Sequence, residues 1–95
     1  MNNIIILLSS STSAARLKNS IMNAGFEASV IGTPTALAHG GCNYSVLTTA
    51  SALKSAEETL ARLGIKYRGI YLDTGLHGSS RYRKIPPGGK NYDIS

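Results

Sequence analysis

Two apolar stripes with helical spacing are related by a shift of 39 residues along the chain. In each stripe the apolar residues recur at intervals of three, four and three, which places them on one face of an amphipathic helix. The first stripe is Ala14, Leu17, Ile21 and Ala24, and the second is Leu53, Ala56, Leu60 and Leu63. Gly25 and Gly64 follow the stripes, where glycine readily adopts the left-handed conformation that ends a helix. The pattern predicts two helices of the same construction.

Apolar and β-branched segments flank each predicted helix on both sides. Residues 4–8 and 26–31 flank the first helix, and residues 44–49 and 66–73 flank the second. A residue whose side-chain oxygen can cap the helix precedes each one: Ser10 or Ser11 for the first, and Thr49 or Ser51 for the second. The chain is therefore a β-α-β unit written twice.

Two such units in succession favour an α+β fold, the ferredoxin-like βαββαβ sandwich, in which two helices cover one face of a four-stranded antiparallel sheet. The first and third strands are the most apolar, so we expect them in the centre of the sheet. The predicted domain spans residues 1–73. Residues 74–95 include the run Pro86-Pro87-Gly88-Gly89, which interrupts regular structure, and are predicted to form a flexible tail.

Composition agrees with one small folded domain, since 42% of the 95 residues are hydrophobic and 16% are charged. The single cysteine excludes an internal disulfide and favours a reducing compartment. The apolar run at residues 4–8 is too short for a signal peptide or a membrane span, so we expect a cytoplasmic protein without a membrane partner. The net charge of +5 is concentrated in the tail, where Arg81, Arg83, Lys84 and Lys90 outnumber Asp93.

Cys42 is the candidate for chemistry. It follows the loop that joins the second and third strands, and His39, Gly40 and Gly41 precede it directly. Successive amides of these three residues could cradle an anion, and the two glycines leave the sulfur accessible. We expect both helices to end at this end of the sheet, where their negative dipole ends would raise the thiol pKa.

Cationic neighbours would have to offset that effect, and Arg62 and Lys66 are the candidates near the same end of the sheet. An unpaired cysteine is also often a small buried hydrophobe, so the sequence leaves two alternatives open for Cys42, an exposed thiolate or a buried side chain.

Other site types are disfavoured by spacing. His39 and His77 do not have the spacing of zinc ligands relative to Cys42, so no metal site is predicted, and no cofactor motif occurs. The tail residues Arg81, Arg83 and Lys84 are predicted to bind a partner. Nucleic acid is disfavoured as that partner, because the first predicted strand has no aromatic residue and the third has one tyrosine.

The chain resembles a family of small bacterial proteins described as putative selenium/sulfur carrier protein-like. The resemblance covers residues 4–73 and is carried by Thr33-Pro34, Ala38 to Gly41, Cys42, Gly64-Ile65 and Gly69-Ile70-Tyr71. It implies that Cys42 accepts sulfur or selenium, as a persulfide or selenosulfide, from a cysteine desulfurase-like donor and passes it to an acceptor protein. Such a carrier needs no catalytic constellation or cofactor of its own, and a homodimer is left open.

The sequence supports one alternative of a different class. In that alternative the protein is a non-catalytic interaction or regulatory module that binds its partners through the exposed sheet face and the basic tail.

Overall fold

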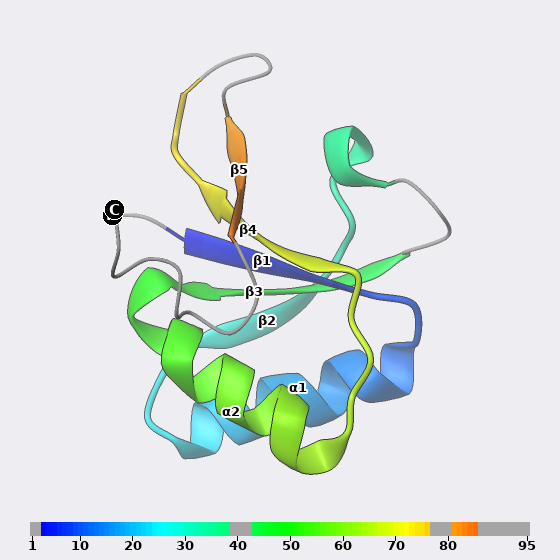
Figure 1. Cartoon of the computed structure of the whole chain (residues 1–95), viewed down its shortest axis with the longest axis vertical. Coiled ribbons are helices and arrows are strands. Elements are labelled where there is room, and N and C mark those ends of the chain that lie inside the picture. Colours follow the sequence, from blue (N-terminus) through cyan, green and yellow to red (C-terminus); the bar gives the residue numbers. More distant parts are fainter. Residues whose placement is uncertain (1–2, 39–42, 77–80, 86–95) are drawn as a thin grey trace.

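The computed structural model describes residues 3–38, 43–76 and 81–85. This part of the chain contains five strands, two α-helices and two short 3-10 turns (Figure 1). In chain order the elements are β1 (Asn3–Leu8), α1 (Ser11–Asn23), β2 (Ala28–Gly32), η1 (Thr35–Leu37), β3 (Tyr44–Thr49), η2 (Ala50–Ala52), α2 (Leu53–Leu63), β4 (Gly69–Asp73) and β5 (Tyr82–Ile85).

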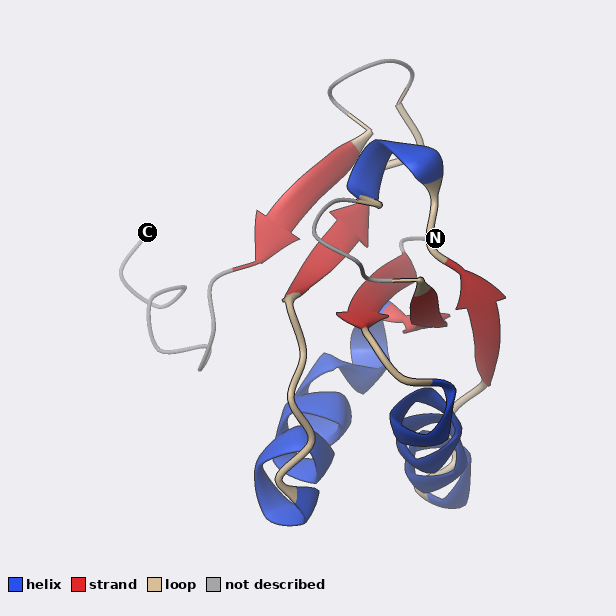
Figure 2. Cartoon of the chain, turned by 90° about the vertical axis from the view of Figure 1, so that its right-hand side faces the viewer, coloured by secondary structure: helices blue, strands red, loops and turns tan. Residues whose placement is uncertain are grey.

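The sheet is antiparallel throughout, with the strand order β2-β3-β1-β4-β5. β1 lies between β3 and β4, and its residue Ile6 pairs with Val46 on one side and with Ile70 on the other. Both helices lie against the same face of the sheet, which is seen most clearly when the molecule is turned by 90° (Figure 2). The α+β class and the two-helix layer are those expected from the sequence.

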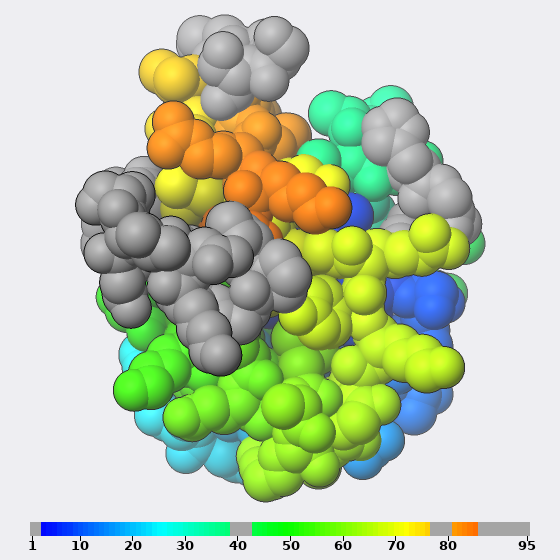
Figure 3. Space-filling view, in the orientation of Figure 1, coloured from blue at the N-terminus to red at the C-terminus, as the bar shows by residue number. Residues whose placement is uncertain are grey.

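The predicted number of four strands was wrong. The fifth strand, β5, comes from the segment that was expected to be a flexible tail, and it pairs with β4 so that Ile85 lies opposite Ile70. The turn between them is closed at its base, where the Thr74 amide donates to the carbonyl of Arg81 (2.8 Å). Figure 3 shows the orange residues of β5 beside the yellow residues of β4. The domain boundary after residue 73 stays a prediction.

The main core lies between the sheet and the helices. Ile4, Ile6 and Leu8 point into it from β1, because alternate residues of a strand face the same side. The predicted helical stripes supply the opposite layer, with Ala14, Leu17, Ile21, Ala56 and Leu60 buried. Each fully buried aliphatic side chain of this size contributes about 1.5–3 kcal/mol, so this layer is the main source of stability.

The other face of the sheet carries a smaller core. Ile5 and Leu7 point to this side, and Leu37 of η1 packs on them. The β2–β3 connection therefore folds back over the sheet before it enters β3. A hydrogen bond of 2.7 Å between the hydroxyls of Thr33 and Ser45 anchors the start of that connection. As a result β1 is buried on both faces, and all of Ile4–Leu8 is inaccessible.

The helix pair preserves the internal repeat. Ser20 of α1 and Thr59 of α2 are 39 residues apart, the same shift that relates the two stripes, and their hydroxyls lie 2.8 Å from each other. Ser10 caps α1 by accepting a hydrogen bond from the Ser13 amide. The expected caps of the second helix were wrong, because η2 lies between Thr49 and α2 and the residue before α2 is Ala52.

We predict that Gly64→Ala destabilises the fold by about 1 kcal/mol, since Gly64 ends α2 with φ +66 and a side chain is strained in that conformation. Gly32→Ala is the control, because an added Cβ at Gly32 meets no atom of the described residues within 4 Å. Urea denaturation of both variants measures the difference. Equal destabilisation by the two substitutions would contradict the assignment of strain to Gly64.

Candidate functional site

The connection that carries Cys42 leaves and re-enters the sheet at the C-terminal end of β1. Gly32, the last residue of β2, pairs with Tyr44, the first residue of β3, and Tyr44 also pairs with Leu8. The Thr33 amide donates to the carbonyl of Asn43 (3.3 Å), which closes the base of the connection. The predictions made for His39, Gly40, Gly41 and Cys42 fall outside the described residues.

The expected polarity of the helices was wrong for α1. β1 and β2 run parallel, with β3 between them, so α1 must run antiparallel to both; it begins beside Leu8 and ends at the opposite end of the sheet. α2 runs from Thr49, at the far end of β3, back toward Gly69, whose partner is Leu7. The connection between β2 and β3 therefore shares its end of the sheet with the N-terminus of α1 and the C-terminus of α2. The N-terminus of a helix carries partial positive charge, which favours an anion nearby.

Two basic residues precede β4 at this end of the sheet. Lys66 and Arg68 line a hollow of about 170 Å³ together with Ser9 and Tyr67. The Arg68 amide donates to the carbonyl of Leu7 (2.9 Å), which holds this segment against the C-terminal residues of β1. Lys66, expected from the sequence as a cationic neighbour of Cys42, therefore lies beside Ser9, next to the start of α1.

The second expected neighbour, Arg62, lies in the helix layer. Its guanidinium donates to the hydroxyl of Ser20 (3.4 Å), and it lines a hollow of about 720 Å³ between α1 and α2. Arg16 and Glu58 line the same hollow. The structure thus separates Arg62 from the hollow that contains Lys66.

The three basic residues predicted for the tail have three different environments. The Arg81 guanidinium bonds both oxygens of Asp73 at 3.3 Å and lies 5.2 Å from the ring centre of Tyr82. The hydrogen bond from Arg81 lowers the pKa of the Asp73 carboxyl. Arg83 faces the helix side of the sheet, where it lines an apolar hollow with Ile85.

Lys84 faces the other side of the sheet and reaches toward the connection that carries Cys42. The backbone of Lys84 pairs with Tyr71. Its Cε atom lies 3.6 Å from the position that a Cβ on Gly69 would occupy, and Gly69 is two residues closer than Tyr71 to the end of the sheet where β4 begins. The Tyr71 Cε1 atom lies 3.2 Å from the same position. A glycine at position 69 therefore leaves the space that the Tyr71 ring and the Lys84 stem fill.

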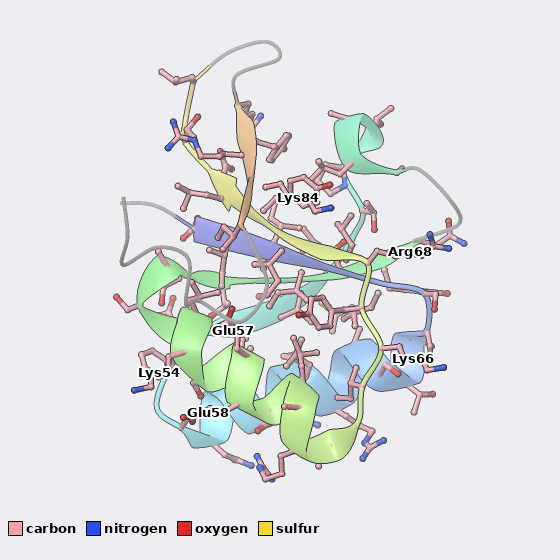
Figure 4. The ribbon with its side chains drawn as sticks, viewed as in Figure 1. Lys54, Glu57, Glu58, Lys66, Arg68 and Lys84 are labelled. Carbon is pink, nitrogen blue, oxygen red and sulfur yellow. The ribbon has the colours of Figure 1, made fainter. Side chains whose placement is uncertain are left out.

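The sequence did not predict that Lys84 lies near this end of the sheet, because residues 74–95 were expected to form a flexible tail. The β-favouring residues Tyr82 and Ile85, which bound the two basic residues, are the only local signal of a strand, and they show no period-two alternation. Figure 4 shows Lys66 and Arg68 on one side of the molecule and Lys54 on the opposite side, with Lys84 between them on the upper part of the sheet.

A family model described as putative Se/S carrier protein-like matches residues 3–72 of the chain. The chain belongs to this family. No curated protein and no solved structure matches the chain. The family description supports a carrier role in general, and the matched range includes position 42.

Two further observations concern metal binding and membrane-spanning helices. Within residues 3–38, 43–76 and 81–85, no three His, Cys, Asp or Glu side chains form a group suited to a metal ion. Neither of the described helices has the length and apolar character needed to cross a bilayer.

Glu57 of α2 is a partly buried carboxylate. It lies in a largely apolar hollow of about 440 Å³ with Leu60, Ile65 and Tyr67. One of its oxygens is buried and has no hydrogen-bond partner among the described residues. Burial raises the pKa of the Glu57 carboxyl above 4.5, because it penalises the charged form.

We predict that Glu57→Gln stabilises the protein at pH 7, because the variant removes a partly desolvated charge. Since the folded-state pKa of Glu57 is raised, the wild type is most stable relative to the variant below pH 4.5 and loses that stability as the pH rises through the folded-state pKa. Urea denaturation of both proteins from pH 4 to 7 measures the difference. A variant that is less stable than the wild type at pH 7 would show that the carboxylate has a stabilising partner.

Proposed function

We propose that the protein carries sulfur or selenium on Cys42 and transfers it from a donor protein to an acceptor protein. The observation that carries this proposal is the family match over residues 3–72, since the described role is that of a carrier and Cys42 is the only cysteine in the sequence. A thiolate is the side chain that can bind sulfane sulfur or selenium and release it again unchanged.

The transfer requires no external oxidant or reductant. The Cys42 thiolate attacks the terminal sulfur of a persulfide on the donor, and a new sulfur–sulfur bond forms. The sulfur–sulfur bond of the donor breaks, and its electron pair leaves with the donor sulfur as a thiolate. A thiolate on the acceptor then attacks the terminal sulfur on Cys42 in the same way, and the Cys42 thiolate is regenerated. A selenium atom in the terminal position would follow the same two steps.

Basic residues at the end of the sheet where β3 begins support this proposal. Cys42 is joined through the single residue Asn43 to Tyr44 at the start of β3, next to the end of β1 where α1 begins. Lys66 and Arg68 lie at that end, and the stem of Lys84 reaches Gly69 there. Positive charge lowers the pKa of a thiol and stabilises a thiolate or a persulfide anion.

The fold fits a small carrier that depends on its partners for catalysis. We propose that β1 to β4 and the two helices form a ferredoxin-like unit; the strand order β2-β3-β1-β4 within the five-stranded sheet supports this. A single cysteine provides no resolving thiol, so each transfer is between two proteins rather than within one. Such thiol chemistry is suited to the reducing cytoplasm.

Mass spectrometry of the intact protein tests this proposal. After incubation with a cysteine desulfurase and cysteine, we expect an adduct of about 32 Da, one sulfur atom, on the wild type but not on Cys42→Ser, and we expect a reductant to remove it. Iodoacetamide labelling of the untreated protein is the control for access to the thiol. If Cys42 is labelled but never gains the adduct, while the desulfurase turns over cysteine normally, a carrier role for this thiol is contradicted.

A further inference from the structure

Three basic side chains from two separate segments approach the same end of the sheet. Lys66 and Arg68 belong to the connection between α2 and β4, and Lys84 belongs to β5. We call these three residues the basic end. Arg68 is adjacent to Gly69, and the Cε atom of Lys84 lies 3.6 Å from the Cβ position at Gly69. Lys66 lines a hollow with Arg68 and Ser9, whereas Lys84 lies apart from that hollow, on the other face of the sheet from the helices (Figure 4).

The position of Lys84 is built into the sheet. An added Cβ at Gly69 would lie 3.2 Å from Tyr71 Cε1, which is tighter than an ordinary contact, and 3.6 Å from Lys84 Cε. The Tyr71 ring and the Lys84 stem thus share the space above a buried glycine. The strand pairing of Lys84 with Tyr71 fixes the base of the side chain, and the Tyr71 ring supports its stem. β5 therefore adds a positive charge near Gly69, at the start of β4.

Two acidic residues of the described chain lie at the opposite end of the sheet. Glu27 precedes β2 and Asp73 ends β4, both at the opposite end of the sheet, and Asp73 is bonded to Arg81. Glu57 and Glu58 lie within α2, between its ends. Glu57 shares a hollow with Tyr67, which also lines the hollow of Lys66 and Arg68. The positive charges of the basic end can attract an anionic surface over a distance of about 8–10 Å at moderate salt.

We infer that the basic end is the docking surface for an acidic surface patch on the proteins that give sulfur or selenium to this carrier and receive it. The inference rests on the proposed function, because it assumes that donors and acceptors must approach the connection that carries Cys42. Donor and acceptor then use the same surface and exclude each other, so the carrier dissociates from one before it binds the other.

An acidic protein surface fits the site better than a nucleic acid. Bases would need exposed aromatic rings on which to stack. On this face the Tyr71 ring packs over Gly69, and Tyr82 is stacked with Arg81, which is itself bonded to Asp73. Leu37 of η1 covers Ile5 and Leu7 on the neighbouring strand. The described rings on this face therefore form no continuous stacking surface, and Tyr67 is the ring that lines the hollow of Lys66 and Arg68.

Binding of poly-L-glutamate to the full chain, followed by NMR, tests the inference. The basic-end variant carries Lys66→Gln, Arg68→Gln and Lys84→Gln. The control variant carries Arg16→Gln, Lys54→Gln and Arg83→Gln, which removes the same net charge from exposed positions on the helices and on the other face of β5. We expect the basic-end variant to bind at least about tenfold more weakly than the wild type, and the control less than about threefold more weakly. Amide shifts should cluster at residues 66–69, 84 and 9–12.

Single substitutions separate docking from folding. Lys84→Gln should weaken the binding of poly-L-glutamate about threefold, whereas Lys84→Arg, which keeps the charge, should bind it as the wild type does. The adjacent substitution Arg83→Gln should have no effect on binding. Thermal unfolding should be unchanged in all three variants. Equal weakening by the basic-end and control variants would overturn the inference, because it would show that only net charge matters. Tighter binding of a single-stranded oligonucleotide than of poly-L-glutamate at the basic end would also overturn it.

Failure of this inference is distinguishable from failure of the carrier proposal. Cys42→Ser removes the thiol but leaves the basic end, so it should bind poly-L-glutamate as the wild type does. Persulfide loading measured on the wild type reports on the carrier role alone.

Discussion

The structure depends on the burial of β1 on both of its faces and the pairing of both of its edges. Ile4 to Leu8 alternate between a large core under the helices and a small core under η1, and none of the five is accessible. β3 and β4 bond to its two edges over nearly its whole length. A strand enclosed in this way can have only one register, because a shift of one residue would exchange the two cores. The direction of β1 then fixes which end of the sheet every other element reaches.

The candidate site follows from that direction. At the C-terminal end of β1 the chain turns into α1, the connection from β2 closes onto Asn43, and the segment before β4 bonds to Leu7 through the Arg68 amide. The same end receives the stem of Lys84 above Gly69. The N-terminus of α1, the C-terminus of α2 and basic side chains therefore meet at this end, although the residues concerned are far apart in the sequence. The site is a property of the topology more than of any short motif.

The sequence predicted the parts of the fold that local periodicity controls. The repeated stripes identified both helices, β3 was predicted with the bounds it has, and the contact between Ser20 and Thr59 reproduces the 39-residue shift in three dimensions. β5 was missed because two basic residues within four positions resemble a solvated tail, and only pairing with β4 makes them a strand. The expected caps of α2 failed because a 3-10 turn precedes it.

The candidate site was less predictable than the fold. The expectation that both helices end beside Cys42 neglected that strands joined by a β-α-β unit run parallel, so the helix between them must begin where the first strand ends. Lys84 could not be placed without the register of β5, and its approach to Gly69 depends on the Tyr71 ring. Arg62 was expected near Lys66 because it lies in the last turn of α2 and Lys66 follows soon after, but the Arg62 side chain turns toward Ser20.

The central claim is that this end of the sheet favours an ionised sulfur at Cys42. The most direct test is the pKa of the Cys42 thiol, measured from the pH dependence of its alkylation by a neutral reagent in the native protein. The account predicts a value well below the ordinary one of about 8.5, and a rise toward that value when salt screens the surrounding charges. A thiol pKa at or above the ordinary value at low salt would contradict it.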